Sequence, residues 1–253
     1  MVWSYSRVSS FMNCMYHFYL KYLVADDDLY LSEGNFYAEV GLFVHEIHEK
    51  LFNGEMDEYE ALRYFVEEFD NNVFYDVKPS IRKNTFDACA EYFADLDLSW
   101  MDEYEILGVE KKINITLDGY KFVGYIDLLL RHKETGQIIL MDHKSAKYPL
   151  KKDGTPAANY KKSFESYTKQ MYLYASAVKE EYDVFPTWIV WNHFKDEKLV
   201  WVKFDDDVYR DSVQWFVDSI HQIEDEENFE PNISYFYCKN LCDFRNSCEY
   251  QES

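Results

Sequence analysis

Two neighbouring hydrophobic segments carry charged residues that could do chemistry. The stretch GYIDLLLRHKETGQIILMDHKSAK, from Gly124 to Lys147, places Asp127, Asp142 and Lys144 in otherwise apolar runs. Burying an unpaired carboxylate or ammonium group is costly, so these residues either pair with one another or bind a metal ion. If the two runs are adjacent strands, both aspartates can reach one cation. Carboxylate oxygens suit Mg²⁺ or Mn²⁺ better than zinc.

Lys144 follows Asp142 by two positions, which places both side chains on the same face of a strand. Two acids and a lysine on one side of a sheet can bind a metal ion, hold a phosphate and orient or activate a water molecule. A structural ion pair between Lys144 and one of the aspartates accounts equally well for the same residues. This stretch alone leaves both interpretations open.

The segment GLFVHEIHEK contributes a further candidate ligand, His45. It does not match the HExxH zinc motif, because that motif requires histidine at position 49, where the chain has Glu49. Gly41 lies one turn before His45 on the same helical face, which predicts close packing against the glycine. A lone histidine on a helix is more often a surface or core residue than a ligand.

The segment from His143 to Lys162 is basic, in a chain whose net charge is −21. It contains six lysines and a single acid, Asp153. A globally acidic surface repels phosphates, and a lysine cluster is often only a solvated loop. Here the cluster begins directly after Asp142 and Lys144, which favours a phosphate-binding role. The lysines expected to take that role are Lys147, Lys151, Lys152, Lys161 and Lys162.

Hydrophobic spacing predicts the elements that must position these residues. Helical spacing predicts helices over about 6–23, 37–52, 163–182 and 206–223, and a largely helical segment over 57–103. An Asp118-Gly119 turn predicts a β-hairpin, IILMDHK a third strand, and PTWIVWNHF with KLVWVKF a second hairpin. Gly54 is expected to end the helix over 37–52. The fold class is α/β, with a central mixed sheet flanked by helices.

The composition indicates one folded domain over 1–253, with a helical insertion at about 55–104 and a cysteine-rich tail at about 231–253. Hydrophobic residues make up 47% of the chain and aromatic residues 19%, enough for a substantial core. No apolar run approaches the roughly 20 residues of a membrane span. The N-terminus lacks the basic and apolar regions of a secretory signal, so we expect a cytoplasmic protein.

Cysteines gather near the two ends of the chain. Cys14 falls on the first predicted helix, and the tail sequence CKNLCDFRNSC contains Cys238, Cys242 and Cys248. An intracellular chain is not expected to use them as a disulfide framework. Cys89, in a helical pattern, is most simply a buried core thiol.

Taken in chain order, the motifs resemble the PD-(D/E)xK nuclease superfamily. They are His45 after a Gly-x-x-x spacer, Glu110 on a first strand, G-Y-I-D with Asp127, D-H-K with Asp142 and Lys144, and Q-M-Y-L-Y with Gln170 and Tyr174. More narrowly they resemble its RecB-like branch, which includes AddAB-type nuclease domains and the small nucleases of CRISPR adaptation. The opening SYSRVSSFMNCMYHFYLKY is similar to that branch's N-terminal helix. The resemblance spans Ser4 to Cys248.

The resemblance implies a restriction-endonuclease-like core and metal-assisted hydrolysis of phosphodiester bonds. His45, Asp127, Asp142 and the backbone carbonyl of His143 would ligate Mg²⁺ or Mn²⁺, and the metal would generate hydroxide and neutralise charge on the phosphate. Lys144 would position or activate the attacking water.

The resemblance also gives roles to three further residues. Gln170 and Tyr174 lie one helical turn apart, and in the family that face contacts DNA and supports the site. Glu110 would take part in catalysis, support the ligands, or merely pair with Lys111 or Lys112.

Cysteine ligands at both chain ends are a further property of that branch. By resemblance, Cys14, Cys238, Cys242 and Cys248 would bind a 4Fe–4S cluster that clamps the termini. The usual tail spacing in the branch is C-x2-C-x5-C, whereas this chain has C-x3-C-x5-C. A structural Zn²⁺ is the competing assignment, because four thiolates also suit a tetrahedral site.

The resemblance therefore implies a divalent-metal-dependent deoxyribonuclease, more narrowly an exonuclease acting on single-stranded or duplex DNA ends in recombination, repair, or CRISPR or phage DNA processing. The chain lacks the GxxxxGK[ST] motif of a helicase, so a helicase, recombination or CRISPR-adaptation partner is expected, in a prokaryotic cell or phage-infected host. A non-catalytic DNA- or partner-binding subunit with the same fold is the alternative. An acidic DNA mimic would explain the charge but not the motifs. An oligomer is compatible with the sequence.

Overall fold

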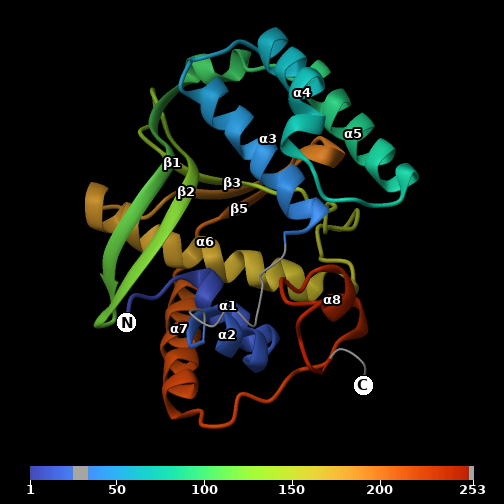
Figure 1. Ribbon diagram of the computed structural model, residues 1–253. Helices are drawn as coiled ribbons and strands as arrows, with labels where there is room; N and C mark the ends of the chain where they lie inside the picture. Colours follow the sequence, from blue (N-terminus) through green and yellow to red (C-terminus); the bar gives the residue numbers. More distant parts are fainter. Residues whose placement is uncertain (25–33, 251–253) are drawn as a thin grey trace.

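Strand-forming sequence lies in the middle of the chain and builds one five-stranded sheet. The computed structural model describes residues 1–24 and 34–250. Its strands are β1 Tyr104–Leu117, β2 Tyr120–His132, β3 Ile138–His143, β4 Trp188–His193 and β5 Lys198–Lys203. They lie in the order β1-β2-β3-β4-β5, with β3 and β4 parallel and all other neighbours antiparallel. The predicted mixed sheet between helices is confirmed (Figure 1).

The turn of the β1–β2 hairpin is the predicted Asp118-Gly119 turn. Both residues have positive φ, 47° and 87°, as a type I′ turn requires. Glycine adopts this conformation at no steric cost, and aspartate tolerates it. The turn places Leu117 opposite Tyr120 and thereby fixes the register of both strands.

One face of the sheet is covered by four helices. They are α1 (Tyr5–Asn13), α2 (Met15–Tyr22), α6 (Lys161–Tyr182) and α7 (Asp206–Asp225). A parallel pair such as β3 and β4 needs a crossover connection, and α6 is part of it. The largest core cluster forms here and includes Tyr172, Trp191 and Phe216, each no more than 1% exposed.

The opposite face carries a second group of helices, drawn at the top of Figure 1. They are α3 (Phe36–Phe52), α4 (Glu58–Asn72) and α5 (Pro79–Ala94), followed by the short 3-10 helix η1 (Ser99–Glu103). These helices share a separate core around Phe65 and Phe93, and it includes the predicted buried thiol of Cys89. Gly54, with φ 71°, follows the end of α3 as predicted.

The first predicted helix, over 6–23, is wrong in one respect, because it is two helices. Cys14 is extended, with φ −159° and ψ 113°, so α1 ends before it and α2 begins after it. The Cys14 N–H still donates to Ser10 O, and the Cys14 carbonyl accepts from Phe18 N–H. Helical hydrogen bonding therefore continues on both sides, and the hydrophobic spacing shows no interruption. Cys14 lies at a break in the helix.

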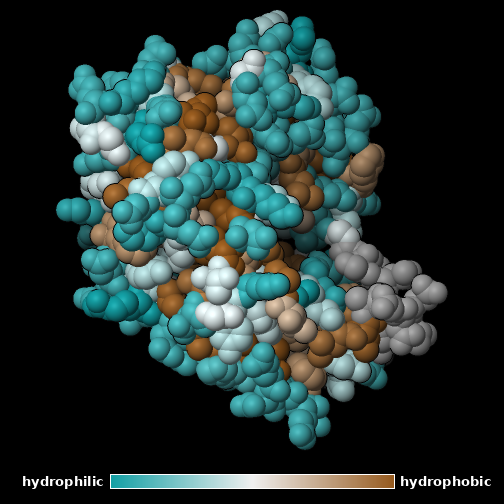
Figure 2. Space-filling view, turned by 90° about the vertical axis from the view of Figure 1, so that its left-hand side faces the viewer, coloured by the Kyte–Doolittle hydropathy of each residue, from teal (hydrophilic) through white to brown (hydrophobic). Residues whose placement is uncertain are grey.

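The remaining elements close the molecule. The 3-10 helix η2 (Phe194–Asp196) joins β4 to β5, and α8 (Tyr235–Asn240) lies in the cysteine-rich tail. None of the described helices is long and apolar enough to cross a membrane. The face shown in Figure 2 is mostly hydrophilic, with apolar residues in several separate groups.

Gly124 of β2 lies against the buried ring of Tyr174. A Cβ atom at Gly124 would stand 2.7 Å from Tyr174 Cε1. We therefore expect Gly124→Ala to lower the free energy of unfolding by about 1–3 kcal/mol, the usual cost of overpacking a core, as measured by urea denaturation.

Gly41→Ala is the matched control, because no described residue outside the helix's own backbone lies within 4 Å of a Cβ atom at Gly41. Replacing this helical glycine should raise the free energy of unfolding by about 1 kcal/mol. A Gly124→Ala protein as stable as wild type would contradict the contact with Tyr174.

Candidate functional site

The site begins where β2 and β3 separate. The ladder between them ends at the pair Leu128 and Met141, so Asp127 and Asp142 stand one step further, at the point of divergence. There the His143 N–H donates to Asp127 Oδ2 at 2.7 Å. The main chain of β3 therefore fixes the Asp127 carboxylate, and the two aspartates lie on neighbouring strands.

Three side chains from three elements form a group that could hold a metal ion. His45 Nδ1 of α3 lies 3.1 Å from Glu110 Oε1 of β1 and 3.6 Å from Asp127 Oδ2 of β2. One ligand atom from each residue lies within 4.8 Å of the others. Within residues 1–24 and 34–250, no other three His, Cys, Asp or Glu side chains meet this condition. The other ring nitrogen, His45 Nε2, lies 3.1 Å from the carbonyl oxygen of His143.

Glu110 reaches this group through an irregular stretch of β1. The strand shifts register between Ile106 and Gly108, and Glu110 has φ 42°. Such a conformation is costly for a residue with a side chain, and it persists where the surroundings impose it, often at functional sites. Lys111 donates to Glu181, so it is not the partner of Glu110. These observations favour a functional role for Glu110.

Lys144 is held by Asp142 and by α6. Its Nζ lies 2.9 Å from Asp142 Oδ1 and 2.8 Å from Oδ2. It also donates to Gln170 Oε1 at 3.1 Å and lies 4.7 Å from the centre of the Tyr167 ring. The ion pair between Lys144 and Asp142, one of the two possibilities that the sequence left undecided, is therefore formed. It lies directly beside the metal-ligand group.

Gln170 and Tyr174 stabilise this arrangement from α6. Gln170 Nε2 donates to Tyr174 OH at 3.4 Å, while Gln170 Oε1 accepts from Lys144. Tyr174 is 8% exposed and packs against Gly124. Their contacts orient Lys144, in line with the supporting part of the role implied for them.

The site favours positive charge. Burial lowers the pKa of His45, but the hydrogen bond to Glu110 and the charges of Asp127, Glu110 and Asp142 outweigh it and raise the pKa to about 9. Burial and the charge of Asp142 raise the pKa of Asp127 to about 7, although His45 and Lys144 act in the opposite direction. Without a metal, His45 therefore carries a proton at neutral pH. A divalent cation can replace that proton.

The side chain of His143 belongs to a buried polar network, with its ring 6.0 Å from the ring of His45. Its ring stacks on His48 with the ring centres 4.0 Å apart, and its Nδ1 lies 3.0 Å from Asn192 Nδ2. Asn192 donates to Tyr92 OH at 3.1 Å, and His48 Nε2 lies 2.8 Å from the same hydroxyl. Burial lowers the pKa of His48 to about 3 and that of His143 well below its usual value, so both rings are neutral. The network fixes the backbone of His143, and with it the carbonyl beside His45.

This network was not predicted from the sequence, although two signals in the sequence indicate it. His48 lies three residues after His45 on the same helix. Asn192 ends the apolar run WIVWN as Asp142 ends IILMD, and β4 runs parallel to β3, so both runs end at the same edge. Asn192 O also accepts from Lys144 N–H at 2.7 Å.

The lysine-rich segment leads from Lys144 to the start of α6. Its five predicted phosphate-binding lysines, at 147, 151, 152, 161 and 162, are all exposed. Tyr148 N–H anchors the segment by donating to Asp196 Oδ2 at 2.6 Å. The lysines are therefore open to solvent, on a segment whose first residue lies in the site.

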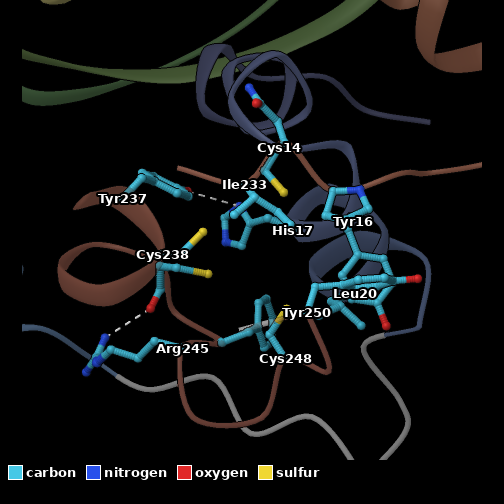
Figure 3. A pocket seen from close by; sticks show the side chains of 14 residues that line it. Cys14, Tyr16, His17, Leu20, Ile233, Tyr237, Cys238, Arg245, Cys248 and Tyr250 are labelled. Carbon is cyan, nitrogen blue, oxygen red and sulfur yellow. Dashed lines mark hydrogen bonds between the residues drawn. The ribbon is translucent and has the colours of Figure 1, made fainter. Parts of the chain in front are cut away.

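The four terminal cysteines line one cavity between the Cys14 break and the tail (Figure 3). Cys14 enters from the helix side, and Cys238, Cys242 and Cys248 from the tail. Burial, with the neighbouring cysteines, raises the pKa of Cys242 to about 11. In the described residues no three of these sulfur atoms meet the 4.8 Å spacing of the metal-ligand group.

Comparison with known proteins identifies one family. The sequence profile of the PD-(D/E)XK nuclease superfamily matches residues 2–249. Among solved structures, 28 chains match. One of them, the crystal structure of SSO0001, is 18% identical with a TM-score of 0.36, over 75% of this chain and 80% of that chain. No curated protein matches the chain.

In the metal-free protein, we expect stability to fall as the pH rises from about 7 to about 9. The pKa of His45 is 6.5 in the unfolded chain and about 9 in the folded protein, so folding takes up a proton in this range. The resulting stabilisation is complete below the unfolded pKa and is lost as the pH passes through the folded pKa. Urea denaturation in EDTA at several pH values measures this decline.

His45→Asn is the matched control and should show a flatter dependence on pH. Mn²⁺ should offset the decline in the wild type, because metal binds the deprotonated ligands. A wild-type slope no steeper than that of His45→Asn would contradict the raised pKa.

Proposed function

The chain belongs to the PD-(D/E)XK nuclease superfamily, and we propose that it is a divalent-metal-dependent deoxyribonuclease acting as an exonuclease on single-stranded or duplex DNA ends. The observation that carries the proposal is the convergence of His45, Glu110 and Asp127 beside the Asp142–Lys144 pair. A sheet edge with this concentration of negative charge and one half-buried lysine suits a cation and a phosphate together.

The donor set fits Mg²⁺ or Mn²⁺, because it is dominated by carboxylates. Glu110 and Asp127 would supply oxygen ligands and His45 a nitrogen, with Asp142 and the His143 carbonyl at hand beside them. When bound, the metal lowers the pKa of a water molecule and neutralises charge on the phosphate.

The residues around the metal would position the substrate and water. Lys144 is held by Asp142 and Gln170, so its ammonium group is oriented before substrate arrives. Gln170 is in turn held by Tyr174. The exposed lysines of the segment that follows Lys144 would attract the phosphate backbone despite the net charge of −21.

A 4Fe–4S cluster held by Cys14, Cys238, Cys242 and Cys248 is the second part of the proposal. Two observations support it. The break at Cys14 brings this residue to the cavity that the tail cysteines line. In addition, Cys248, Cys238 and Cys14 each act electrostatically on the Cys242 thiol and raise its pKa, so the four sulfur atoms lie near one another. The cluster would hold the two chain ends together.

Cleavage of end-labelled DNA with Mn²⁺, Mg²⁺ or EDTA tests the nuclease. We expect metal-dependent degradation by the wild type and none by Asp142→Ala or Lys144→Ala. Lys144→Ala should keep its DNA affinity within about tenfold, because one lysine is a minor part of phosphate binding. The order in which labelled products appear gives the polarity.

Two outcomes would change this proposal. Cleavage retained by Lys144→Ala would remove Lys144 from the catalytic role. Absence of cleavage on every substrate, with DNA binding intact, would favour a non-catalytic DNA-binding subunit instead.

Visible absorption of protein purified without oxygen tests the cluster. We expect a brown wild type and loss of the colour in Cys242→Ala, since a thiolate ligand to iron is removed. Cys89→Ala is the matched control, because Cys89 is a buried cysteine in another core cluster. A colourless wild type containing one zinc per chain would support the structural zinc site.

A further inference from the structure

A groove opens from the metal-ligand group between α3 and the β1–β2 hairpin. Its volume is about 690 Å³, within the range of small-molecule sites. His45 and Glu110 lie in it together with residues that the nuclease chemistry does not use. The main ones are Gly41, Leu42, Glu46, Glu49 and Tyr125.

Two large apolar side chains in this groove are exposed. Leu42 of α3 is 73% exposed and Tyr125 of β2 is 51% exposed. Tyr125 makes no ring contact with another aromatic side chain in the described part of the chain, whereas Phe122, three residues before it, packs against Tyr174. The Tyr125 ring and the Leu42 side chain are therefore available to a ligand.

The strand geometry directs Tyr125 to the side of the metal-ligand group. Tyr125 lies two residues before Asp127 in β2, whereas its neighbours Gly124 and Ile126 are buried on the α6 side. Gly41 leaves the groove open between Leu42 and His45, since a Cβ atom there would meet nothing within 4 Å. The packing predicted against Gly41 is therefore not supplied by the described residues of this chain.

The acidic residues of the groove favour an uncharged ring there, and a lysine beside the groove favours a phosphate next to it. Glu46 and Glu49 on α3 repel phosphates but not an uncharged ring. Lys112, the cross-strand partner of Tyr125, is exposed on the hairpin. A flat apolar ligand with an anionic group on one side matches this arrangement.

We propose that Tyr125 and Leu42 hold one unpaired nucleobase of single-stranded DNA beside the metal-ligand group, with Lys112 binding an adjacent phosphate. The inference rests on the proposed nuclease function and assigns its substrate as single strands or frayed ends. Inside a duplex each base is paired and stacked on both sides, and even a terminal base stays paired, so Tyr125 and Leu42 can hold a base between them only on a single strand or a frayed end. Base–aromatic stacking is sequence-tolerant, so this contact selects for strandedness and not for sequence.

Binding of fluorescein-labelled oligo-dT and of a duplex of equal length, measured by anisotropy in EDTA, tests this assignment without cleavage. Tyr125→Ala should weaken single-strand binding about tenfold, the loss of one base–aromatic stack, and change duplex binding less than about twofold. Tyr125→Phe keeps the ring and should bind as wild type. Tyr59→Ala is the matched control, because Tyr59 is 72% exposed on α4, away from the groove.

An abasic scan locates the contact. Removing one base at the stacked position should weaken binding to the wild type but not to Tyr125→Ala. Equal losses on single strands and duplex, no loss in Tyr125→Ala, or no binding of single strands by the wild type would each overturn the assignment.

Cleavage assays on the same preparations separate this inference from the proposed function. If the wild type binds single strands through Tyr125 but cleaves no DNA, the proposed base site is supported and the proposed nuclease activity is contradicted. If Tyr125→Ala changes neither the cleavage nor the binding of single strands, the proposed nuclease activity is supported and the proposed base site is contradicted.

Discussion

The structure depends on a concentration of negative charge where β2 and β3 separate. Asp127 is held there by a main-chain N–H of β3, Glu110 reaches the same nitrogen of His45 from a backbone with positive φ, and Asp142 lies on the neighbouring strand. Carboxylates so close together in a partly buried place repel one another. The protein compensates with cations of its own, from His45 on one face of the sheet and Lys144 on the other.

This constraint explains why both helical layers meet at one point. α3 carries His45 to the charge from one side, while α6 carries Gln170 and so holds Lys144 from the other. The two layers otherwise have separate cores, one around Phe65 and one around Tyr172. The neutral network of His48, His143, Asn192 and Tyr92 fills the space below His45, where another charge would be unfavourable.

The parts of the fold that local chemistry determines could be predicted from the sequence. The Asp118-Gly119 turn, the end of α3 before Gly54 and the alternating strands each depend on residues close in the chain. Polar residues within apolar strands likewise indicated Asp127, Asp142 and Lys144. The sequence could not show how the site divides, with Asp127 beside His45 and Asp142 paired to Lys144.

Other features of the site depend on partners far apart in the chain. Glu110 has a positive φ and no strand partner in the β1–β2 register, and no residue type near it in the sequence signals this. The hydrogen bonds of Tyr92 join residues separated by 44 and 100 positions. The break at Cys14 preserves the hydrophobic spacing on both sides, so periodicity cannot reveal it.

The short helix α1 links β2 to the place where the two chain ends meet. Before α1, Trp3 pairs with the start of β2, on the side that β3 does not reach. Trp3 N–H donates to Lys121 O at 2.8 Å and Val123 N–H donates to Trp3 O at 2.9 Å. After α1, Cys14 lines the cavity that it shares with the C-terminal tail. Lys21 also donates a hydrogen bond to Asp243 in the tail, 222 positions away. Joining segments so distant in sequence costs loop-closure entropy on folding, which the contacts between them must offset. A ligand bound by both ends would help to offset that cost, and its loss would loosen the N-terminal segment whose Trp3 pairs with the strand that carries Asp127.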